Sequence, residues 1–334
     1  MRALVTGGGG FLGRYIVEQL LARGDEVTVF SRGAYPELAQ AGARLSRGDI
    51  QDREALVRAC TGMDVVYHAA AKAGLWGEWS AFYGVNVVGT ENVIAACLSC
   101  GVPRLVNTSS PSVIFDGKSQ EGLDETAPYP VRYESPYPHT KAIAEQRVTA
   151  ANSAALLTVS LRPHLIFGPR DTHLLPGLLA RAARGQVPQV GSGTNRVDLS
   201  YVEDAARSHL LAADALQPGS PVAGRLYFIS QGEPVVLWPW IGELLAALGL
   251  PAIRKRYSLG LARAAGGLLA AVHSGLRLSG EPRLTPFLAS ELAQSHYYDI
   301  SSARSDLGYA PHYTMARALE KTIAWLKAHD DWRV

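Results

Sequence analysis

The stretch Ala3-Leu4-Val5-Thr6-Gly7-Gly8-Gly9-Gly10-Phe11-Leu12-Gly13 decides the fold. A short apolar run ends in a glycine turn. Apolar residues at helical spacing then extend from Phe11 to Arg23, and Gly24 marks the helix end. This pattern predicts a buried strand, a tight turn and a helix. The pattern of the rest of the chain shows the fold to which this strand–turn–helix unit belongs.

The first half of the chain alternates short β-branched runs with helical patterns. Such alternation predicts an α/β fold, a Rossmann-type doubly wound parallel sheet. The second half predicts a smaller, mostly helical substrate lobe. We assign residues 1–167 to a dinucleotide-binding domain to which 204–231 return, and residues 168–203 and 232–334 to the second lobe. The expected strands are 3–6, 26–30, 45–48, 65–69, 104–108, 158–162 and 226–229, and the later helices are 173–184, 204–216, 237–248, 286–295 and 314–328.

The glycine turn predicts a dinucleotide site. Glycines allow positive φ and a close approach of pyrophosphate to the backbone, and the helix N-terminus holds the phosphates. The four-glycine run fits two spacings, Gly8-Gly10-Gly13 and Gly7-Gly10-Gly13. The predicted cofactor contacts in this turn are Gly7, Gly10, Phe11, Leu12 and Gly13.

The end of the second predicted strand selects the cofactor. Ser31-Arg32-Gly33 stands where an NAD enzyme places a carboxylate for the ribose hydroxyl. A guanidinium there can bind a 2′-phosphate, so the sequence favours NADP, with NAD as the alternative. After the third strand, Asp49 is placed to meet the adenine amino group and Ile50 to pack on the ring. Alternatively, Asp49 begins a helix.

Tyr137 and Lys141 are four residues apart on a predicted helix and therefore share one face. The chain has only six lysines among its 32 basic residues, so a lysine at this spacing is informative. Upstream, the run Asn107-Thr108-Ser109-Ser110-Pro111-Ser112 ends the fifth strand. Because ligands bind at the carboxyl ends of parallel strands, these hydroxyls and the Tyr–Lys pair predict one catalytic site.

Taken together, these motifs resemble the extended short-chain dehydrogenase/reductase superfamily. The resemblance implies that Tyr137 is the general acid, that Lys141 stabilises its phenolate and holds the cofactor ribose, and that Ser110, or alternatively Ser109, binds the substrate carbonyl. It also implies cofactor contacts from residues after the fourth, fifth and sixth strands: Ala69, Ala70, Ala71, Lys72, Asn107, Pro163 and His164. The other matching motifs are Asn86 in NVVGT, Leu161-Arg162-Pro163 and Val197–Asp204.

Within the superfamily, the chain looks most similar to the 3β-hydroxysteroid dehydrogenase-like branch, and within that to bacterial 2-alkyl-3-oxoalkanoate reductases. The branch motifs are 108–115, 168–171, 173–176 and 307–309, and the narrower ones are 71–77 and 124–130. The resemblance implies NADPH-dependent reduction of a long-chain β-keto acid in olefin biosynthesis. The alternatives are an NAD-linked 3β-hydroxysteroid or 4-carboxysterol 3-dehydrogenase and a sugar-nucleotide epimerase or reductase.

Two further functions are disfavoured. Dehydratases of the superfamily place two acids where this chain has Pro111 and Ser112. A cofactor-sensing regulator usually lacks the tyrosine or the lysine, and both are present here.

The expected substrate pocket is apolar. Trp76, Trp79, Phe82 and Tyr83 follow the fourth strand and either wall a channel or pack the loop, and Ser112 lies near the catalytic serine. Lys72 could also meet a substrate carboxylate or be solvated. No metal site is expected from three cysteines, and Cys97 and Cys100 end a helix as packed thiols.

Charge and segment patterns limit the partners. The net charge of +2 argues against nucleic acid, and the N-terminus shows no secretory segment, so we expect a cytoplasmic protein. The resemblance implies a homodimer formed by helices 87–100 and 137–150, with other enzymes of the pathway as possible partners. The apolar stretch 257–278 is interrupted by Arg263, His273 and Arg277, so it predicts a helix of the second lobe with at most peripheral membrane contact.

Overall fold

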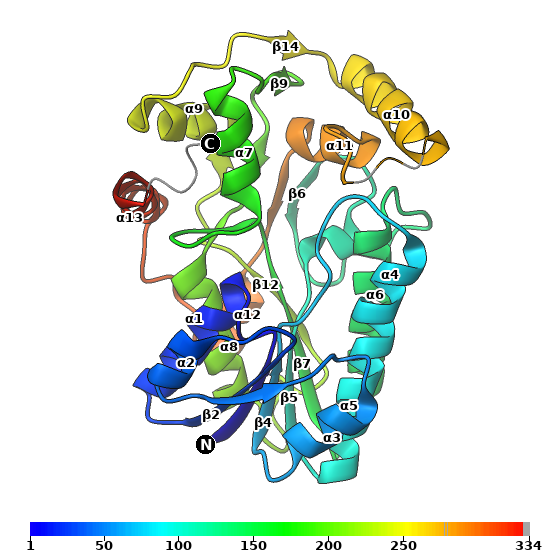
Figure 1. Cartoon of the computed structure of the whole chain (residues 1–334), viewed down its shortest axis with the longest axis vertical. Coiled ribbons are helices and arrows are strands. Elements are labelled where there is room, and N and C mark those ends of the chain that lie inside the picture. The colour runs from blue at the N-terminus through cyan, green and yellow to red at the C-terminus, as the bar shows by residue number, and fades with distance from the viewer. Residues whose placement is uncertain (277, 279, 330–334) are drawn as a thin grey trace.

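A seven-stranded parallel sheet forms the centre of the larger lobe (Figure 1). The computed structural model describes residues 1–276, 278 and 280–329, so Arg277 lies outside the described residues. The strand order is β12-β7-β5-β4-β1-β2-β3. This confirms the predicted Rossmann-type class and all seven of its strands. Their bounds are β1 (Arg2–Thr6), β2 (Glu26–Ser31), β3 (Arg44–Arg47), β4 (Val65–His68), β5 (Arg104–Thr108), β7 (Leu157–Pro163) and β12 (Leu226–Ile229).

Helices cover both faces of this sheet because its strands are apolar on both sides. Ala3 and Val5 of β1 pack with α1 (Phe11–Ala22) and α8 (Val202–Ala215), whereas Leu4 packs with the helices of the opposite face. Those helices are α3 (Arg53–Cys60), α5 (Gly89–Cys100) and α6 (Pro136–Ala150), and a short α2 (Pro36–Gln40) lies beside β3. Helices therefore bury both faces of the sheet, and a ligand can bind only at the carboxyl ends of its strands.

The second lobe has its own hydrophobic core and the helices predicted for it. They are α7 (Leu174–Ala183), α9 (Leu237–Ala247), α10 (Leu259–Gly275), α11 (Pro286–Ala293) and α13 (Met315–Ala328). Small sheets join these helices, and the sequence did not predict them. Their strands are β13 (Val235–Val236), β10 (Arg196–Val197), β15 (His296–Tyr298) and β6 (Gln120–Leu123) in one sheet, with the pairs β8 (Ile166–Phe167) and β11 (Ser200–Tyr201), and β9 (Gln189–Val190) and β14 (Arg256–Tyr257).

The chain passes between the two lobes more than once. As expected, α8 packs on α1 and β12 pairs with β7. A second return was not expected: Tyr298–Tyr309, which includes α12 (Ser301–Leu307), packs in the larger core. The lobes are thus interleaved, which fixes the second lobe over the carboxyl edge of the sheet.

One continuous helical segment, Trp79–Cys100, is long and apolar enough to cross a membrane by length and composition alone. It comprises α4 (Trp79–Tyr83), a π-helical turn (Gly84–Val88) and α5. The segment packs against α3 and α6 and is close to half buried. We read it as a core helix of this lobe.

Candidate active site

The glycine turn leaves room for an anion at the start of α1. Gly7 has φ +70°, and a Cβ there would lie 2.7 Å from the Cα of Ala70. A Cβ on Gly13 would lie 2.2 Å from the Gly7 carbonyl oxygen. Gly10 is the N-cap and offers no side-chain cap, and the first turn of α1 has no acidic residue. Because the N–H groups of that turn are open to a ligand, the site fits a pyrophosphate.

The structure brings Ser110, Tyr137 and Lys141 together. Ser110 ends the loop after β5, and its Oγ lies 3.0 Å from that of Ser112. Burial raises the pKa of Tyr137, and a hydrogen bond with the Ser110 hydroxyl partly offsets that rise. The Lys141 Nζ donates to the Thr108 carbonyl across 2.5 Å. The predicted catalytic residues therefore come together at the carboxyl end of β5, with Ser110 bonded to Tyr137 and Lys141 held by the Thr108 carbonyl.

Lys141 is buried yet available for chemistry near neutral pH. Burial lowers its pKa to about 8, and the negative charge of Glu145 one turn later acts in the opposite direction. Since the charged form prevails below that value, the lysine can stabilise a developing phenolate on Tyr137. An amine beside a tyrosine hydroxyl and a serine hydroxyl can polarise and protonate a carbonyl oxygen.

Asn86 ties the loop after β4 to the catalytic helix. Its Oδ1 accepts from the Lys72 N–H at 2.7 Å, and its Nδ2 donates to the Lys72 carbonyl at 3.1 Å and to the Thr140 Oγ at 3.0 Å. Ala70 and Ala71 of this loop are partly or fully exposed, as a cofactor contact requires. Asn86 is thus a positioning residue for the predicted cofactor loop.

Two buried oxygens at the end of β5 fit a polar ligand. The Asn107 Nδ2 donates to Ser160 at 3.0 Å. Within the described chain, however, the Asn107 Oδ1 and the Ser109 Oγ have no hydrogen-bond partner. Buried polar atoms are rarely left unpaired, so these atoms are available to the nicotinamide end of a cofactor. Asn107 was predicted there, and Ser109 was the alternative carbonyl donor.

The structure decides one alternative for Asp49. The N-cap of α3 is Asp52, whose side chain accepts from the Ala55 N–H at 3.0 Å, so Asp49 does not begin this helix. Asp49 instead accepts from the Gln51 N–H at 2.9 Å. Ile50 is buried against Gly89 of α5. The adenine contacts of Asp49 and Ile50 remain predictions.

Two residues near Arg32, Arg47 and Tyr35, were not predicted from the sequence. The Arg47 Nε donates to the Arg32 carbonyl at 2.9 Å, because the pairing of β2 with β3 sets Ser31 beside Arg47. The ring of Tyr35 covers Gly9, where a Cβ would lie 2.0 Å from the ring. The only signal for Arg47 was its place at the end of the third strand, which becomes meaningful once the strand order is known.

His164 follows Pro163 at the end of β7, and its backbone N–H is already used. It donates to the Ile229 carbonyl and to the Ser200 Oγ, both at 3.1 Å. Its ring is buried, with Nε2 2.6 Å from the Nδ1 of His296. Any cofactor carboxamide contact through the backbone here therefore falls to a carbonyl oxygen.

Trp79 and Tyr83 pack on each other, and Trp79 also packs on α6. Trp79 packs on His139 with ring centroids 4.8 Å apart, and Tyr83 packs on Trp79 at 5.8 Å. His139 is two residues after Tyr137 and therefore on the other side of the helix. These ring contacts are what loop packing, one of the two alternatives, requires, and the assignment of Trp79 and Tyr83 to the substrate pocket stays a prediction.

Trp76, Phe82 and Lys72 occupy other positions. The Trp76 ring lies against His273 of α10 with centroids 6.5 Å apart, so it stays near the second lobe. Phe82 is fully buried. The Lys72 Nζ lies 5.1 Å from the Phe82 ring centroid. Ser112, also predicted in the pocket, lies beside Ser110, with 3.0 Å between the two Oγ atoms.

The chain is similar in sequence to a curated reductase and a curated dehydrogenase, and in fold to a structure solved with NAD. A curated 2-alkyl-3-oxoalkanoate reductase from Stenotrophomonas maltophilia is 46% identical over 97% of this chain and 99% of its own length. Human sterol-4-alpha-carboxylate 3-dehydrogenase, decarboxylating, is 36% identical over 96% of this chain and 87% of its own. The solved structure of MoeE5 in complex with UDP-glucose and NAD matches with a TM-score of 0.76 and 27% identity, over 98% of this chain and 99% of that one.

The two curated relatives are named as a reductase and a dehydrogenase, and the third protein was solved with NAD. The chain is an NAD(P)-dependent oxidoreductase. The profile of the 3-beta hydroxysteroid dehydrogenase/isomerase family matches residues 4–260. The chain belongs to this family.

Proposed function

We propose that this enzyme reduces a long-chain 2-alkyl-3-oxoalkanoic acid to the 2-alkyl-3-hydroxyalkanoic acid with NADPH, in hydrocarbon or olefin biosynthesis. The observation that carries the proposal is the Ser110–Tyr137–Lys141 cluster in a chain that aligns over nearly its whole length with a reductase of that name. We expect it to act as a cytoplasmic homodimer.

The roles of the residues follow from their contacts. When bound, the nicotinamide supplies a hydride to the carbonyl carbon. The hydroxyls of Ser110 and Tyr137 hold the carbonyl oxygen, and Tyr137 gives it a proton. The positive charge of Lys141, held by the Thr108 carbonyl, stabilises the phenolate that Tyr137 becomes. Burial of this cluster strengthens each of these interactions.

The NADPH preference rests on the end of β2. Ser31 and Arg32 stand there without a carboxylate, and Arg47 lies beside them. Two guanidinium groups at one strand edge favour a 2′-phosphate. Solved relatives carry NAD in their titles, so this preference is the part of the proposal that most needs its own measurement.

A direct test is turnover in the oxidative direction, because 3-hydroxy acids are more stable reagents than β-keto acids. The purified chain is given 2-alkyl-3-hydroxyalkanoic acids of increasing chain length with NADP⁺ or NAD⁺, and formation of the reduced nicotinamide is followed by absorbance. We expect turnover that rises with chain length and then levels off, because each buried methylene contributes about 0.8 kcal/mol. Tyr137→Phe should lower turnover by roughly 10²–10⁴-fold while cofactor still binds.

The rival substrates define the contrary result. A 4-carboxysterol with NAD⁺ tests the sterol dehydrogenase alternative, which the human relative supports at lower identity. UDP-glucose with NAD⁺ tests the sugar-nucleotide alternative, since MoeE5 was solved with that pair. A preference for either rival, or turnover independent of alkyl chain length, would overturn the proposed substrate.

A further inference from the structure

Large apolar side chains gather on one exposed face of α10. Among the described residues, thirteen large hydrophobic side chains are exposed, and seven of them lie between 257 and 278. Leu268 and Leu276 are each 68% exposed, and Leu261 is 57% exposed. Isolated exposed leucines are ordinary, but a contiguous set on one helix marks an interaction surface. Four of the seven, Leu261, Leu268, Leu269 and Val272, lie in α10, and Tyr257, Leu276 and Leu278 flank it.

The opposite face of α10 is fixed to the rest of the enzyme. Ala262 and Gly266 are buried, and a Cβ on Gly266 would lie 2.7 Å from the backbone of Thr285. Arg263 pairs with Glu134 at 2.5 Å and donates to the Ser290 Oγ. The helix therefore has one packed face, whose cation is paired, and one face composed of apolar side chains and small residues.

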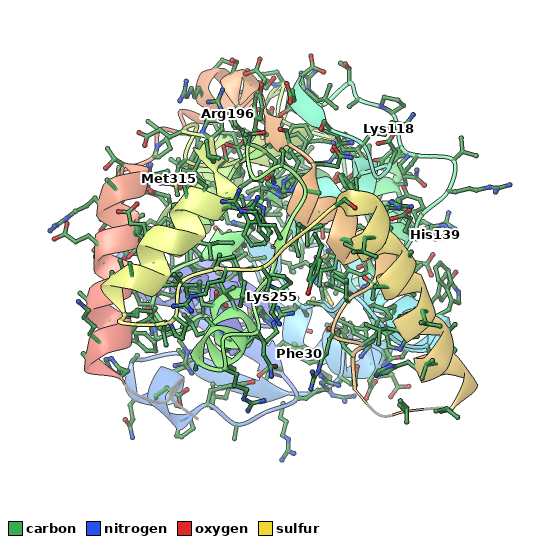
Figure 2. The ribbon with its side chains drawn as sticks, turned by 90° about the horizontal axis from the view of Figure 1, so that it is seen from above. Phe30, Lys118, His139, Arg196, Lys255 and Met315 are labelled. Carbon is green, nitrogen blue, oxygen red and sulfur yellow. The ribbon has the colours of Figure 1, made fainter. Side chains whose placement is uncertain are left out.

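A basic strip precedes this face. Arg254, Lys255 and Arg256 are all exposed and lead into α10. Between Glu243 and Glu281 the chain carries five basic residues and no acidic one. Figure 1 shows β14 and α10 along one end of the molecule, and Figure 2 looks onto that end, with Lys255 labelled. Apolar side chains beside unpaired cations are typical of helices that lie in the interface of an anionic bilayer.

We propose that the α10 face, defined as the seven exposed apolar residues with Arg254, Lys255 and Arg256, docks on an anionic lipid surface. A second copy of the chain is a poorer occupant. A symmetric contact through this face would set the two basic strips against each other, and like charges across an interface cost affinity.

Docking at this face would bring the bilayer beside the segment that leads into α6 and the loop that follows β4. Glu134, the partner of Arg263, directly precedes Ser135, the N-cap of the helix that carries Tyr137. Glu281 accepts from the Leu75 N–H at 3.1 Å, and His273 contacts Trp76. The docking itself does not depend on the proposed substrate.

The test is co-sedimentation of the full-length enzyme with vesicles, without substrate. One set is phosphatidylcholine alone, and the other is equal parts phosphatidylcholine and phosphatidylglycerol. We expect binding to the anionic set that weakens as salt is added. Leu268→Gln with Leu276→Gln should reduce binding at least tenfold, because each substitution removes an apolar side chain that would be buried in the lipid. Lys255→Glu with Arg256→Glu should remove the preference for anionic vesicles.

Matched controls separate this surface from general stickiness. Leu45→Gln alters an exposed leucine on β3, and Arg58→Glu alters an exposed arginine on α3; both should bind vesicles as the parent does. All variants should keep turnover of a short soluble substrate. The proposal fails if the parent ignores anionic vesicles, if the α10 variants bind unchanged, or if those variants turn a dimer into a monomer. Vesicle binding is measured without turnover. A negative result for binding therefore does not contradict the proposed reaction, and a negative result for the reaction does not contradict vesicle binding.

Discussion

Glu145 and Arg162 form a buried ion pair one helical turn from the catalytic lysine. The Arg162 Nε donates to the Glu145 Oε2 at 2.8 Å and its Nη2 to the Oε1 at 2.6 Å, with both side chains essentially inaccessible to solvent. The Tyr129 hydroxyl donates to the same carboxylate at 2.6 Å. The guanidinium also lies near the rings of Tyr129 and Phe228. This pair links α6, the helix of Tyr137 and Lys141, to strand β7 of the large sheet.

Breaking this pair should destabilise the fold strongly. Arg162→Met leaves the Glu145 carboxylate buried without its partner, which costs about 3–5 kcal/mol. Urea unfolding followed by circular dichroism measures the loss. The double variant Glu145→Gln with Arg162→Met should lose less than the sum of the two single variants, since neither charge is then stranded. Additive losses would show that the pair is not coupled.

The pH dependence of reduction should report Lys141. Its pKa of about 8 means that the lysine loses its charge above that pH, so kcat/KM for reduction should fall on the alkaline side. Glu145→Gln removes the negative charge that raises this pKa, and the alkaline limb should move to lower pH. A pH profile of both forms under saturating cofactor is the measurement. An unmoved limb would mean that another group controls it.

The sequence predicted the large sheet because most of its strands are short apolar runs. The glycines after the first strand also fit only a tight turn between a strand and a helix. It also predicted that Ser110, Tyr137 and Lys141 come together, since Tyr137 and Lys141 are close in sequence and Ser110 follows a strand. It did not predict the contacts of Arg47 or Tyr35. Arg47 reaches Arg32 only through the pairing of β2 with β3, and Tyr35 reaches Gly9 only through the fold of its loop. Trp79 and Tyr83 were ambiguous because spacing does not show which side of α6 a neighbouring helix packs on.

The cofactor preference should depend on the two arginines at the edge of β2 and β3. Arg32→Ala should weaken NADPH roughly tenfold to a hundredfold and leave NADH almost unchanged, because a charged hydrogen bond contributes about 1.5–3 kcal/mol. Arg47→Ala should show a smaller effect in the same direction. The measurement is kcat/KM with each cofactor. If the parent prefers NADH, or Arg32→Ala weakens both cofactors equally, Arg32 does not select the cofactor.

The predicted homodimer should form through α5 and α6. These helices lie side by side and are joined by an ion pair between Glu91 and Arg147 at 3.1 Å. Leu98 on α5 is 47% exposed and would be covered by a symmetric partner. Sedimentation velocity at micromolar concentration should show a dimer, and Leu98→Arg should shift it toward monomer, whereas Leu45→Arg on β3 should not. A monomeric parent would contradict this prediction.

The last prediction concerns stability in acid, and it rests on histidines that are buried in their neutral form. Burial lowers the pKa of His68 to about 3 and of His209 to about 4, and lowers that of His164 well below its usual range. For His68, the positive charge of Lys141 adds to the effect of burial, and the hydrogen bonds of its ring fit the neutral form. Thr90 donates its hydroxyl proton to the Asn86 carbonyl at 2.6 Å, so it accepts from the His68 Nε2 at 2.9 Å, and the Thr6 hydroxyl lies 2.7 Å from the other ring nitrogen.

The sign follows from proton counting. An unfolded histidine titrates near 6.5, so below that pH the unfolded chain binds protons that the folded chain does not, and stability falls as pH falls. Each such histidine contributes a loss of about 1.4 kcal/mol per pH unit. Asp198, whose pKa burial raises to about 6, acts in the opposite direction over part of this range. A net loss on the order of 1–3 kcal/mol per pH unit should therefore appear below pH about 6.

Urea unfolding at a series of pH values measures this loss of stability, and His209→Gln should reduce the slope by removing one titrating group. A stability that stays level from neutral pH into this range, or a slope unaffected by His209→Gln, would show that these rings do not control the acid response.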